Sequence, residues 1–195
     1  RNNRRAGLRV GYADGIEVRN SRITENCGGN YGVSLAETPN ALFVGNNVSN
    51  NTGVGMQVFD VSPNLTVRDS QFDNNGGLGG FQDEPGTTLV NVTANGNAGY
   101  GISASSDTVL RNATVRNNTD QGLTLDDNVT VDGGTFLDNG GVEVETEGEL
   151  SATDLTVASA QFATVEANEI DLRNSVPPYP DLPANYAYTA TNVSV

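Results

Sequence analysis

The chain has 195 residues and a formal net charge of −14, and all ten of its basic residues are Arg, since Lys is absent. This acidic balance excludes nucleic acid as a partner, because nucleic-acid binding needs a basic footprint. It also disfavours an anionic membrane surface. No run of about 18 apolar residues occurs, so we expect no membrane insertion within this segment. Leu, Ile, Val and Phe make up about a quarter of the residues, which is enough for a thin core.

The excess of carboxylates also predicts a salt-rich environment. At low ionic strength such a chain repels itself, whereas in molar salt the Debye length falls to roughly 3 Å and the repulsion is screened. The acid-rich, Lys-free composition resembles that of proteins from extremely halophilic archaea, and an ordinary acidic surface is the alternative. The single cysteine, Cys27, excludes an internal disulfide and is silent about the compartment.

From the N-terminus onward, one phrase keeps returning. It reads ITENCGGNYGVSL at 23–35, VSNNTGVGMQV at 48–58 and VRNNTDQGLTL at 115–125. Each copy has an apolar residue three positions before an Asn, and successive Asn residues lie 21 to 25 positions apart. The six pairs are Ile23/Asn26, Val48/Asn51, Phe72/Asn75, Ala94/Asn97, Val115/Asn118 and Phe136/Asn139. A repeat of this length indicates stacked units.

Short alternating stretches predict the strands of each unit. Period-2 stretches follow the Asn residues at Val33/Leu35, Met56/Val58, Ile102/Ala104 and Leu123/Leu125, and a second run reads IEV at 16, LTV at 65 and VTV at 129. No stretch has the 3.6-residue period of a helix. The leucine-rich-repeat frame is missing, and a propeller blade needs about 40 residues. The sequence therefore predicts an all-β fold, a single-stranded parallel β-helix (solenoid) of about seven coils.

The repeated Asn marks a corner of each coil. Asn tolerates the left-handed backbone conformation that a sharp corner needs. Stacked coils would bring the repeated Asn residues into register, where their amides can form a hydrogen-bonded ladder. The predicted ladder consists of Asn26, Asn51, Asn75, Asn97, Asn118 and Asn139. The repeat departs from its pattern at 78–90, where Gly80 stands in place of a core residue, and we expect a bulge there with Phe81 turned inward.

A family resemblance follows from these repeats. The pattern GIEVRNSRITEN…YGVSL resembles the right-handed parallel β-helix repeats of the pectate-lyase-like superfamily, in particular the carbohydrate-binding and sugar-hydrolase type of NosD-like surface proteins. The resemblance covers residues 7–160 and implies a right-handed helix. Members of that superfamily include polysaccharide lyases, hydrolases, epimerases, tailspikes and surface proteins without activity, so the resemblance leaves the activity open.

We divide the chain into one β-helix domain, residues 1–175, and a tail. Regular coils are expected over 7–160 and an irregular last coil over 161–175. Residues 176–195 carry four of the seven prolines, and we interpret this segment as a linker or a strap along the rod and not as another coil.

Few residues could support catalysis. His is absent, which removes the commonest general base and metal ligand, and Cys27 therefore has no His to deprotonate it. A lyase-like site would need an Arg beside carboxylates. The candidates for it are Arg68, Arg111, Arg116 and Asp83.

A row of acids follows the first strand of successive coils. It consists of Glu37, Asp60, Asp83, Asp107, Asp126 and Glu147, at spacings of 19 to 24 residues. Oxygen ligands in a row could bind Ca²⁺, although acids that keep a halophilic surface hydrated would lie there too. We expect no cofactor, with a Ca²⁺ ion at Asp60, Asp83, Asp107 and Asp126 as the alternative.

Asn-x-Ser/Thr sequons are more frequent than chance gives. They begin at Asn47, Asn50, Asn64, Asn91, Asn112, Asn117, Asn128 and Asn192. The excess is typical of a glycosylated exported protein. Strands that alternate polar residues would also produce it.

Together these features predict a non-enzymatic β-helix domain of an exported or cell-surface protein of a halophile. It would serve as a rigid scaffold or a glycan-contacting module, with polysaccharide or other cell-surface components as partners. The N-terminal residues lack the apolar stretch of a signal peptide. The alternative is a polysaccharide lyase, hydrolase or epimerase that acts on an acidic glycan through an Asp/Arg site. A cluster of Arg and Asp in a groove would favour the enzyme, and a flat, evenly acidic face would favour the scaffold.

The charge balance makes a prediction about salt. We expect the melting temperature to rise steadily between about 0.1 M and about 3 M KCl, because salt screens the repulsion among the acids. The rise should exceed that of a β-helix that carries no net charge. Calorimetry across that range measures it. A melting temperature that stays constant would contradict the halophilic interpretation.

Overall fold

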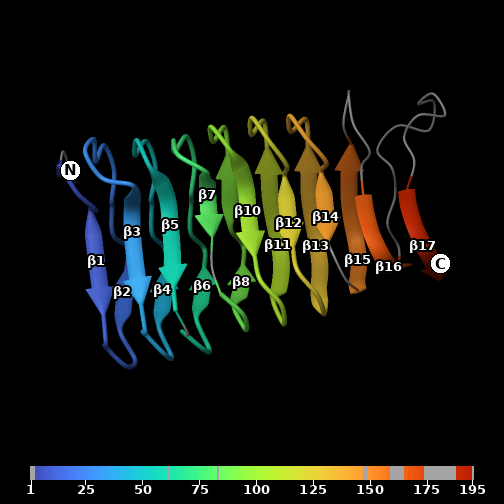
Figure 1. The fold of residues 1–195 in the computed structure, drawn as a ribbon, viewed down its shortest axis with the longest axis horizontal. Coiled ribbons are helices and arrows are strands. Elements are labelled where there is room, and N and C mark those ends of the chain that lie inside the picture. The colour runs from blue at the N-terminus through green and yellow to red at the C-terminus, as the bar shows by residue number, and fades with distance from the viewer. Residues whose placement is uncertain are drawn as a thin grey trace.

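The computed structural model describes residues 3–60, 62–82, 84–146, 149–158, 165–173 and 188–194, and for Glu149, Ala158 and the last two ranges it describes only the backbone. In these residues 17 strands and no helix are present, and each strand pairs in parallel with strands of the neighbouring coil. Figure 1 shows the coils following one another along the long axis of the molecule. The predicted all-β parallel β-helix of about seven coils is confirmed. Within the described part of the chain, no helix is long and apolar enough to cross a bilayer.

Three faces run along the rod, each built from one strand segment per coil. The first face contains β1 Leu8–Gly11, β3 Tyr31–Ala36, β5 Val54–Phe59, β7 Gly79–Gln82, β10 Tyr100–Ala104, β12 Leu123–Leu125 and β14 Val144–Thr146. The second contains β2 Glu17–Arg19, β4 Leu42–Val44, β6 Thr66–Arg68, β8 Thr88–Val90 and the first halves of β11 Val109–Arg116, β13 Val129–Leu137 and β15 Glu149–Ala158. The third contains the second halves of β11, β13 and β15, with β9 Thr93–Asn95 and the bridged residues Arg22, Asn47 and Gln71.

Two further strands continue the parallel ladder. β16 Val165–Arg173 pairs with β14 and β15, and β17 Tyr188–Ser194 pairs with β16. β17 thus lies inside the segment 176–195 that the sequence analysis treats as a tail. Residues 174–187 lie outside the described residues, so the division into a domain and a linker or strap remains a prediction.

The core is a stack of apolar columns that run along the rod axis. On the first face the inward column consists of Val33, Met56, Phe81, Ile102 and Leu123, in register and fully buried. The apolar residues that precede the repeated Asn form a second column on the third face: Ile23, Val48, Phe72, Ala94, Val115 and Phe136. Because parallel strands stack without a shift, one inward position per coil suffices to build each column.

The predicted Asn ladder is present and buried. Each ladder side chain is at most 4% exposed, and from Asn26 to Asn118 each Nδ2 donates to the Oδ1 of the next Asn over 2.8–3.3 Å. The same Oδ1 also accepts the backbone N–H of the preceding ladder residue. The second hydrogen of the amide goes to the carbonyl of an apolar column residue, as from Asn75 to Val48 over 2.9 Å. These buried amides therefore have partners in both neighbouring coils.

Two residues extend and close the ladder. At the N-terminal end, Asn3 donates its Nδ2 to Asn26 Oδ1 over 3.1 Å. At the other end, the buried Glu143 accepts the backbone N–H of Asn139 at Oε1 over 3.0 Å and the Asn139 Nδ2 at Oε2. The Glu143 carboxylate thus supplies both acceptor positions that a seventh Asn would have supplied.

A column of glycines faces the ladder. It consists of Gly7, Gly32, Gly55, Gly80, Gly101 and Gly122, and a Cβ at any of these positions would come within 2.4–2.8 Å of a ladder Nδ2. The predicted bulge at Gly80 is therefore wrong. Gly80 occupies the regular glycine position, and Phe81 pairs in register with Met56 and Ile102 as an ordinary inward residue. The ladder amide fills the space that a side chain would need.

The corner conformation also needs a correction. The ladder Asn residues do not have positive φ; the left-handed residue is the one just before each of them. These residues are Glu25, Asn50, Asn74, Gly96, Asn117 and Asp138, with φ between 54° and 65°, and all are exposed. The left-handed residue turns the chain, and the turn directs the next side chain inward. The two tasks that we assigned to one Asn belong to consecutive residues.

The ladder makes a prediction about stability. Asn75→Ala should lower the free energy of unfolding by about 3 kcal/mol, because it removes the Oδ1 that accepts from both the backbone N–H and the Nδ2 of Asn51, and the Nδ2 that donates to the Val48 carbonyl. Asn128→Ala removes an exposed bond to Asp107 and places Ala at a φ of 56°, which together should cost about 1–2 kcal/mol. Denaturant unfolding of both variants measures the difference. Equal losses would show that the buried ladder adds no stability.

Candidate functional site

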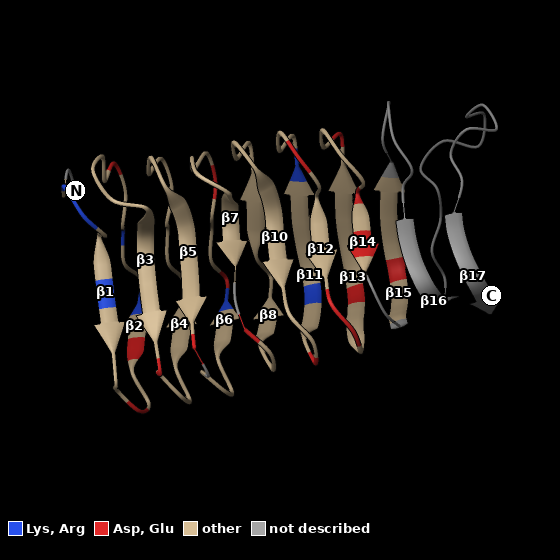
Figure 2. Ribbon diagram, in the orientation of Figure 1, with Lys and Arg blue, Asp and Glu red and all other residues tan. Residues whose placement is uncertain are grey.

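The outward row of the first face carries charge only at its ends. The row runs in register through Arg9, Ser34, Gln57, Gln82, Ser103, Thr124 and Glu145. Figure 2 shows β3, β5, β7, β10 and β12 without charged residues, whereas acids gather in the turns at the strand ends. The face is therefore neither evenly acidic nor crowded by long charged side chains.

Glycine-rich loops hollow this face near its N-terminal end. A Cβ at Gly28 would come within 2.5 Å of the Arg4 carbonyl oxygen, and a Cβ at Gly53 within 2.0 Å of the Asn30 carbonyl oxygen. Backbones of successive coils can approach this closely only without side chains. Two adjoining hollows result, and both are lined by Gly28, Gly29, Asn30 and Tyr31.

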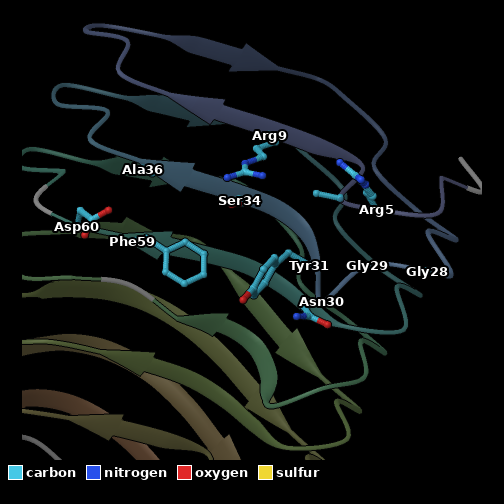
Figure 3. A pocket seen from close by; sticks show the side chains of 11 residues that line it. Arg5, Arg9, Gly28, Gly29, Asn30, Tyr31, Ser34, Ala36, Phe59 and Asp60 are labelled. Atoms are coloured by element: carbon cyan, nitrogen blue, oxygen red, sulfur yellow. The ribbon is translucent and has the colours of Figure 1, made fainter.

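The first of them, which we name the cationic hollow, has a volume of about 710 Å³. It is lined by Arg5, Ala6, Arg9, Gly28, Gly29, Asn30, Tyr31, Ser34, Ala36, Phe59 and Asp60. Figure 3 shows Arg5 and Arg9 on one side of the hollow and Asp60 at its other end. Both arginines are exposed. Among the described residues, ion pairs join Arg19 to Glu17 and Arg111 to Asp132, and neither Arg5 nor Arg9 takes part in one.

An aromatic pair lines the cationic hollow. The rings of Tyr31 and Phe59 meet edge to face, with centroids 5.2 Å apart and planes at 82°. Both side chains are partly exposed, and Figure 3 shows them side by side on the outside of the sheet. This arrangement holds an apolar surface rigidly beside polar groups, which suits the stacking of a flat ligand.

The second hollow, which we name the neutral hollow, has a volume of about 550 Å³ and contains no charged residue. Its lining consists of Cys27, Gly28, Gly29, Asn30, Tyr31, Thr52, Gly53, Val54, Gln57, Gly77 and Leu78. Leu78 is 60% exposed, which is unusual for a large apolar side chain in this protein. The amide and hydroxyl groups of the lining can donate and accept hydrogen bonds.

Farther along the face, Tyr100 occupies the register position of Tyr31. It lies against Gly79, where a Cβ would come within 2.6 Å of its ring. Burial raises the pKa of Tyr100 to about 12, and a hydrogen bond with Ser103 partly opposes this rise. The phenol therefore stays neutral at physiological pH. Nearby, the buried Oε1 of Gln82 has no hydrogen-bond partner in the described part of the protein.

The candidate catalytic residues of the sequence analysis lie on other faces. Arg68 and Arg111 lie in one column of the second face, two coils apart, where Arg111 is 3.7 Å from Asp132. Arg116 lies on the third face, and Asp83 lies outside the described residues. The structure therefore does not bring the three arginines together, and none of them lines the hollows.

The acid row is only partly in register. Glu37 and Asp60 follow β3 and β5 at equivalent corners, with φ of 51° and 56°. Asp107 lies in a different column, where its Oδ1 accepts from Asn128 Nδ2 over 2.5 Å. Asp126 directly follows β12, and Asp83 and Glu147 lie outside the described residues. The turns between first and second strands differ in length, so equal sequence spacing does not give one row. In the ranges that the structure covers, no three His, Cys, Asp or Glu side chains are placed to hold a metal ion.

The sequon Asn residues lie mostly at corners. Asn50, Asn64, Asn91, Asn112, Asn117 and Asn128 are exposed and have φ between 51° and 62°. Asn47 lies on the third face, where its Nδ2 donates to Gln71, and the side chain of Asn192 lies outside the described residues. In several sequons the Asn forms the corner, a buried residue follows, and the Thr begins the next outward row. The fold thus accounts for much of the sequon excess, and glycosylation remains a prediction.

Sequence reasoning missed the residues of the two hollows. Tyr31 lies two residues before Val33 and four before Leu35, so a strict alternation of inward and outward side chains would place it in the core. The glycine between them faces the ladder amide, which breaks the alternation and leaves Tyr31 on the outside. Met56 and Val58 point inward, so the alternation predicts that Phe59 points outward. This pattern could have identified Phe59 as a surface residue.

Solved structures of similar fold include an alginate epimerase and a mannuronan epimerase. The periplasmic alginate epimerase AlgG matches with a TM-score of 0.73 at 13% identity, over 91% of this chain and 49% of that one. Its T265N mutant matches with a TM-score of 0.72 at 14% identity, over 91% and 49%. The A-module of the mannuronan C-5 epimerase AlgE4 from Azotobacter vinelandii matches with a TM-score of 0.54 at 15% identity, over 88% and 61%. The chain thus spans 49% to 61% of the length of these structures, and at such identity they share its fold.

No curated protein matches the chain. The model of the family described as "Right handed beta helix region" matches residues 6–162. This range covers most of the chain and contains the ladder, the glycine column and both hollows. The protein therefore belongs to the right-handed β-helix family.

Proposed function

We propose that this protein is a non-enzymatic, glycan-contacting β-helix domain of an exported or cell-surface protein of a halophile. The contact surface is the N-terminal half of the first face. The observation that carries the proposal is the pair of adjoining hollows, 710 and 550 Å³ in volume, that share the Tyr31 region on an otherwise regular rod. The names of the structures with a similar fold, which are epimerases of alginate and of mannuronan, also favour a carbohydrate ligand.

The chemistry of the hollows suits a sugar. A pyranose ring presents an apolar side that packs on an aromatic ring, as Tyr31 and Phe59 offer. Its hydroxyl groups both donate and accept, and the side chains of Gln57, Asn30 and Thr52 can do the same. Arg5 and Arg9 have no carboxylate partner among the described residues and can bind an acidic group of the glycan. Rigid strands hold these groups, so little order is lost on binding.

One observation favours the enzymatic alternative, a lyase, hydrolase or epimerase acting on an acidic glycan. The cationic hollow is lined by Arg5, Arg9 and Asp60 as well as Tyr31, so Arg and Asp line one groove. Proton abstraction from a sugar carbon needs a base within hydrogen-bond reach of that carbon. The chain has no His, and in Figure 3 Asp60 lies on the far side of Phe59 from Tyr31. We therefore favour binding over catalysis.

The cellular setting is part of the proposal. The charge of −14 without Lys supports a salt-rich medium, and the sequons support export. Polysaccharide or other cell-surface components are the partners that we propose, and the charge argues against nucleic acid.

Glycan binding can be tested with one aromatic residue and a matched control. We expect immobilised acidic polysaccharides, alginate and pectate among them, to retain the wild-type chain, and Tyr31→Ala to weaken retention about tenfold or more. Tyr12→Ala is the control, because Tyr12 is 83% exposed and does not line either hollow. Equal binding by all three chains would rule out the first face, and no retention on any polysaccharide would reject glycan binding.

The same samples decide between binding and catalysis. We expect prolonged incubation to leave the polysaccharides unchanged in size, in ultraviolet absorbance and in their proton NMR spectra. Unsaturated products, shorter chains or inverted uronate residues that disappear in an Arg9→Ala variant would establish the enzymatic alternative.

A calcium site at the acid row is the remaining alternative. We expect calcium to raise the melting temperature no more than magnesium or potassium at equal ionic strength, because Ca²⁺ needs six to eight oxygens at about 2.3–2.6 Å and neighbouring coils lie about 4.8 Å apart. Thermal melts in the three salts measure this. A calcium-specific rise at micromolar concentration, lost in Asp83→Asn, would support a calcium site.

A further inference from the structure

We infer that the ligand of the first face is a heteroglycan in which one acidic residue is joined to neutral residues, with the acidic residue at the β1 end. This inference rests on the proposed glycan contact and adds the charge pattern of the ligand. It separates the expected ligand from a uniform polyuronate, in which every residue carries a carboxylate.

The two hollows differ in charge. The cationic hollow contains Arg5 and Arg9, which no carboxylate of the described residues pairs with. The neutral hollow, which begins at Tyr31, contains no charged residue at all. Beyond it, the outward row continues through Gln82, Ser103 and Thr124 before it reaches Glu145. One end of the face therefore attracts an anion, the middle is uncharged, and the other end repels an anion.

The distance between the two hollows along the rod determines which residues of a bound glycan can carry a carboxylate. Arg9 and Gln57 are two coils apart, which is about 10 Å at the usual strand spacing. A glycan that runs along the rod from Arg9 thus carries its following residues over Gln57 and Leu78. A carboxylate in that position would lose hydration without meeting a cation, which is costly. A neutral sugar would instead exchange hydroxyl bonds with amides and pack against the Leu78 side chain.

The other direction across the face leads to the same charge pattern. A glycan laid along the strands from Arg9 would reach the ends of β3 and β5, where Glu37 and Asp60 follow. Both are acidic, and the net charge of the whole chain is −14. A second carboxylate on the ligand is therefore disfavoured in either orientation.

Three tetrasaccharides of one backbone test the inference. They are β-1,4-linked tetramannosides that carry a carboxylate on every residue, on one terminal residue only, or on none. We expect calorimetric titration of the wild-type chain to give the highest affinity for the singly acidic member, about tenfold above both others, as one charge-assisted contact implies. Equal or higher affinity for the fully acidic member would overturn the inference, and so would equal affinity for the neutral one.

Three variants assign the preference to its residues. Arg9→Gln should abolish the preference for the singly acidic member over the neutral one, whereas Arg68→Gln, which removes the same charge from the second face, should leave it intact. Gln57→Lys adds a cation to the neutral hollow and should raise the affinity for the fully acidic member. A preference that survives Arg9→Gln would contradict the inference.

The outcomes distinguish this inference from the proposed function. If polysaccharides retain the chain but the singly acidic tetramannoside is not preferred, the heteroglycan alone is rejected. If none of the three tetramannosides and no immobilised polysaccharide binds, the glycan contact and the heteroglycan are rejected together.

Discussion

Each coil of this protein buries a primary amide, and a buried donor or acceptor without a partner costs about 1–3 kcal/mol. The ladder avoids this cost only when neighbouring coils are stacked in register, because Asn51 needs Asn75 on one side and Ile23 and Asn26 on the other. A shift of one residue would leave several groups unpaired at once. The same amides exclude a Cβ at Gly32 and Gly55. Register, the glycine column and the position of the corner residue all follow from the buried amide.

The ladder also shapes the surface that we propose to be functional. Because a glycine must face each amide, the strand that follows begins with a break in its alternation, and Tyr31 is left outside. The loops before these strands contain glycines, and the backbone of the neighbouring coil occupies the space that a side chain at these glycines would need. The rod is thereby hollowed beside a fixed aromatic pair while its core stays regular. A rigid, locally uncharged face on a strongly acidic protein is a suitable surface for a sugar chain.

Much of the fold could be predicted from the sequence because its signals are periodic. The interval between Asn residues indicated the coils, and the apolar residue three positions earlier marked a column that is indeed buried. The corner conformation was assigned to the wrong residue, since Asn is common both at the left-handed position and in the ladder, as Asn50 and Asn51 illustrate. Gly80 was misread because a glycine that makes room for an amide looks like a missing core residue.

The candidate site was harder to predict than the fold. Sequence spacing aligned Asp107 with Asp60, but turns of unequal length put them in different columns. Arg9 and Phe59 are 50 positions apart, and only the stacking of β1, β3 and β5 brings them to one hollow. A hollow depends on the side chains that are missing from neighbouring loops. The glycines that leave this space do not recur at a fixed interval in the sequence. The sequence therefore contained no indication of the hollows comparable to the repeat that indicated the coils.

Hydrogen exchange of side-chain amides tests the central claim most directly. In NMR spectra with assigned Asn side chains, the Nδ2 protons of Asn51, Asn75, Asn97 and Asn118 should exchange with solvent far more slowly than those of Asn64 and Asn91. The first group is buried and bonded in both directions, and the second is exposed with single bonds to Asn40 and Asp69. Similar exchange rates for both groups would contradict an amide ladder that holds the coils in register.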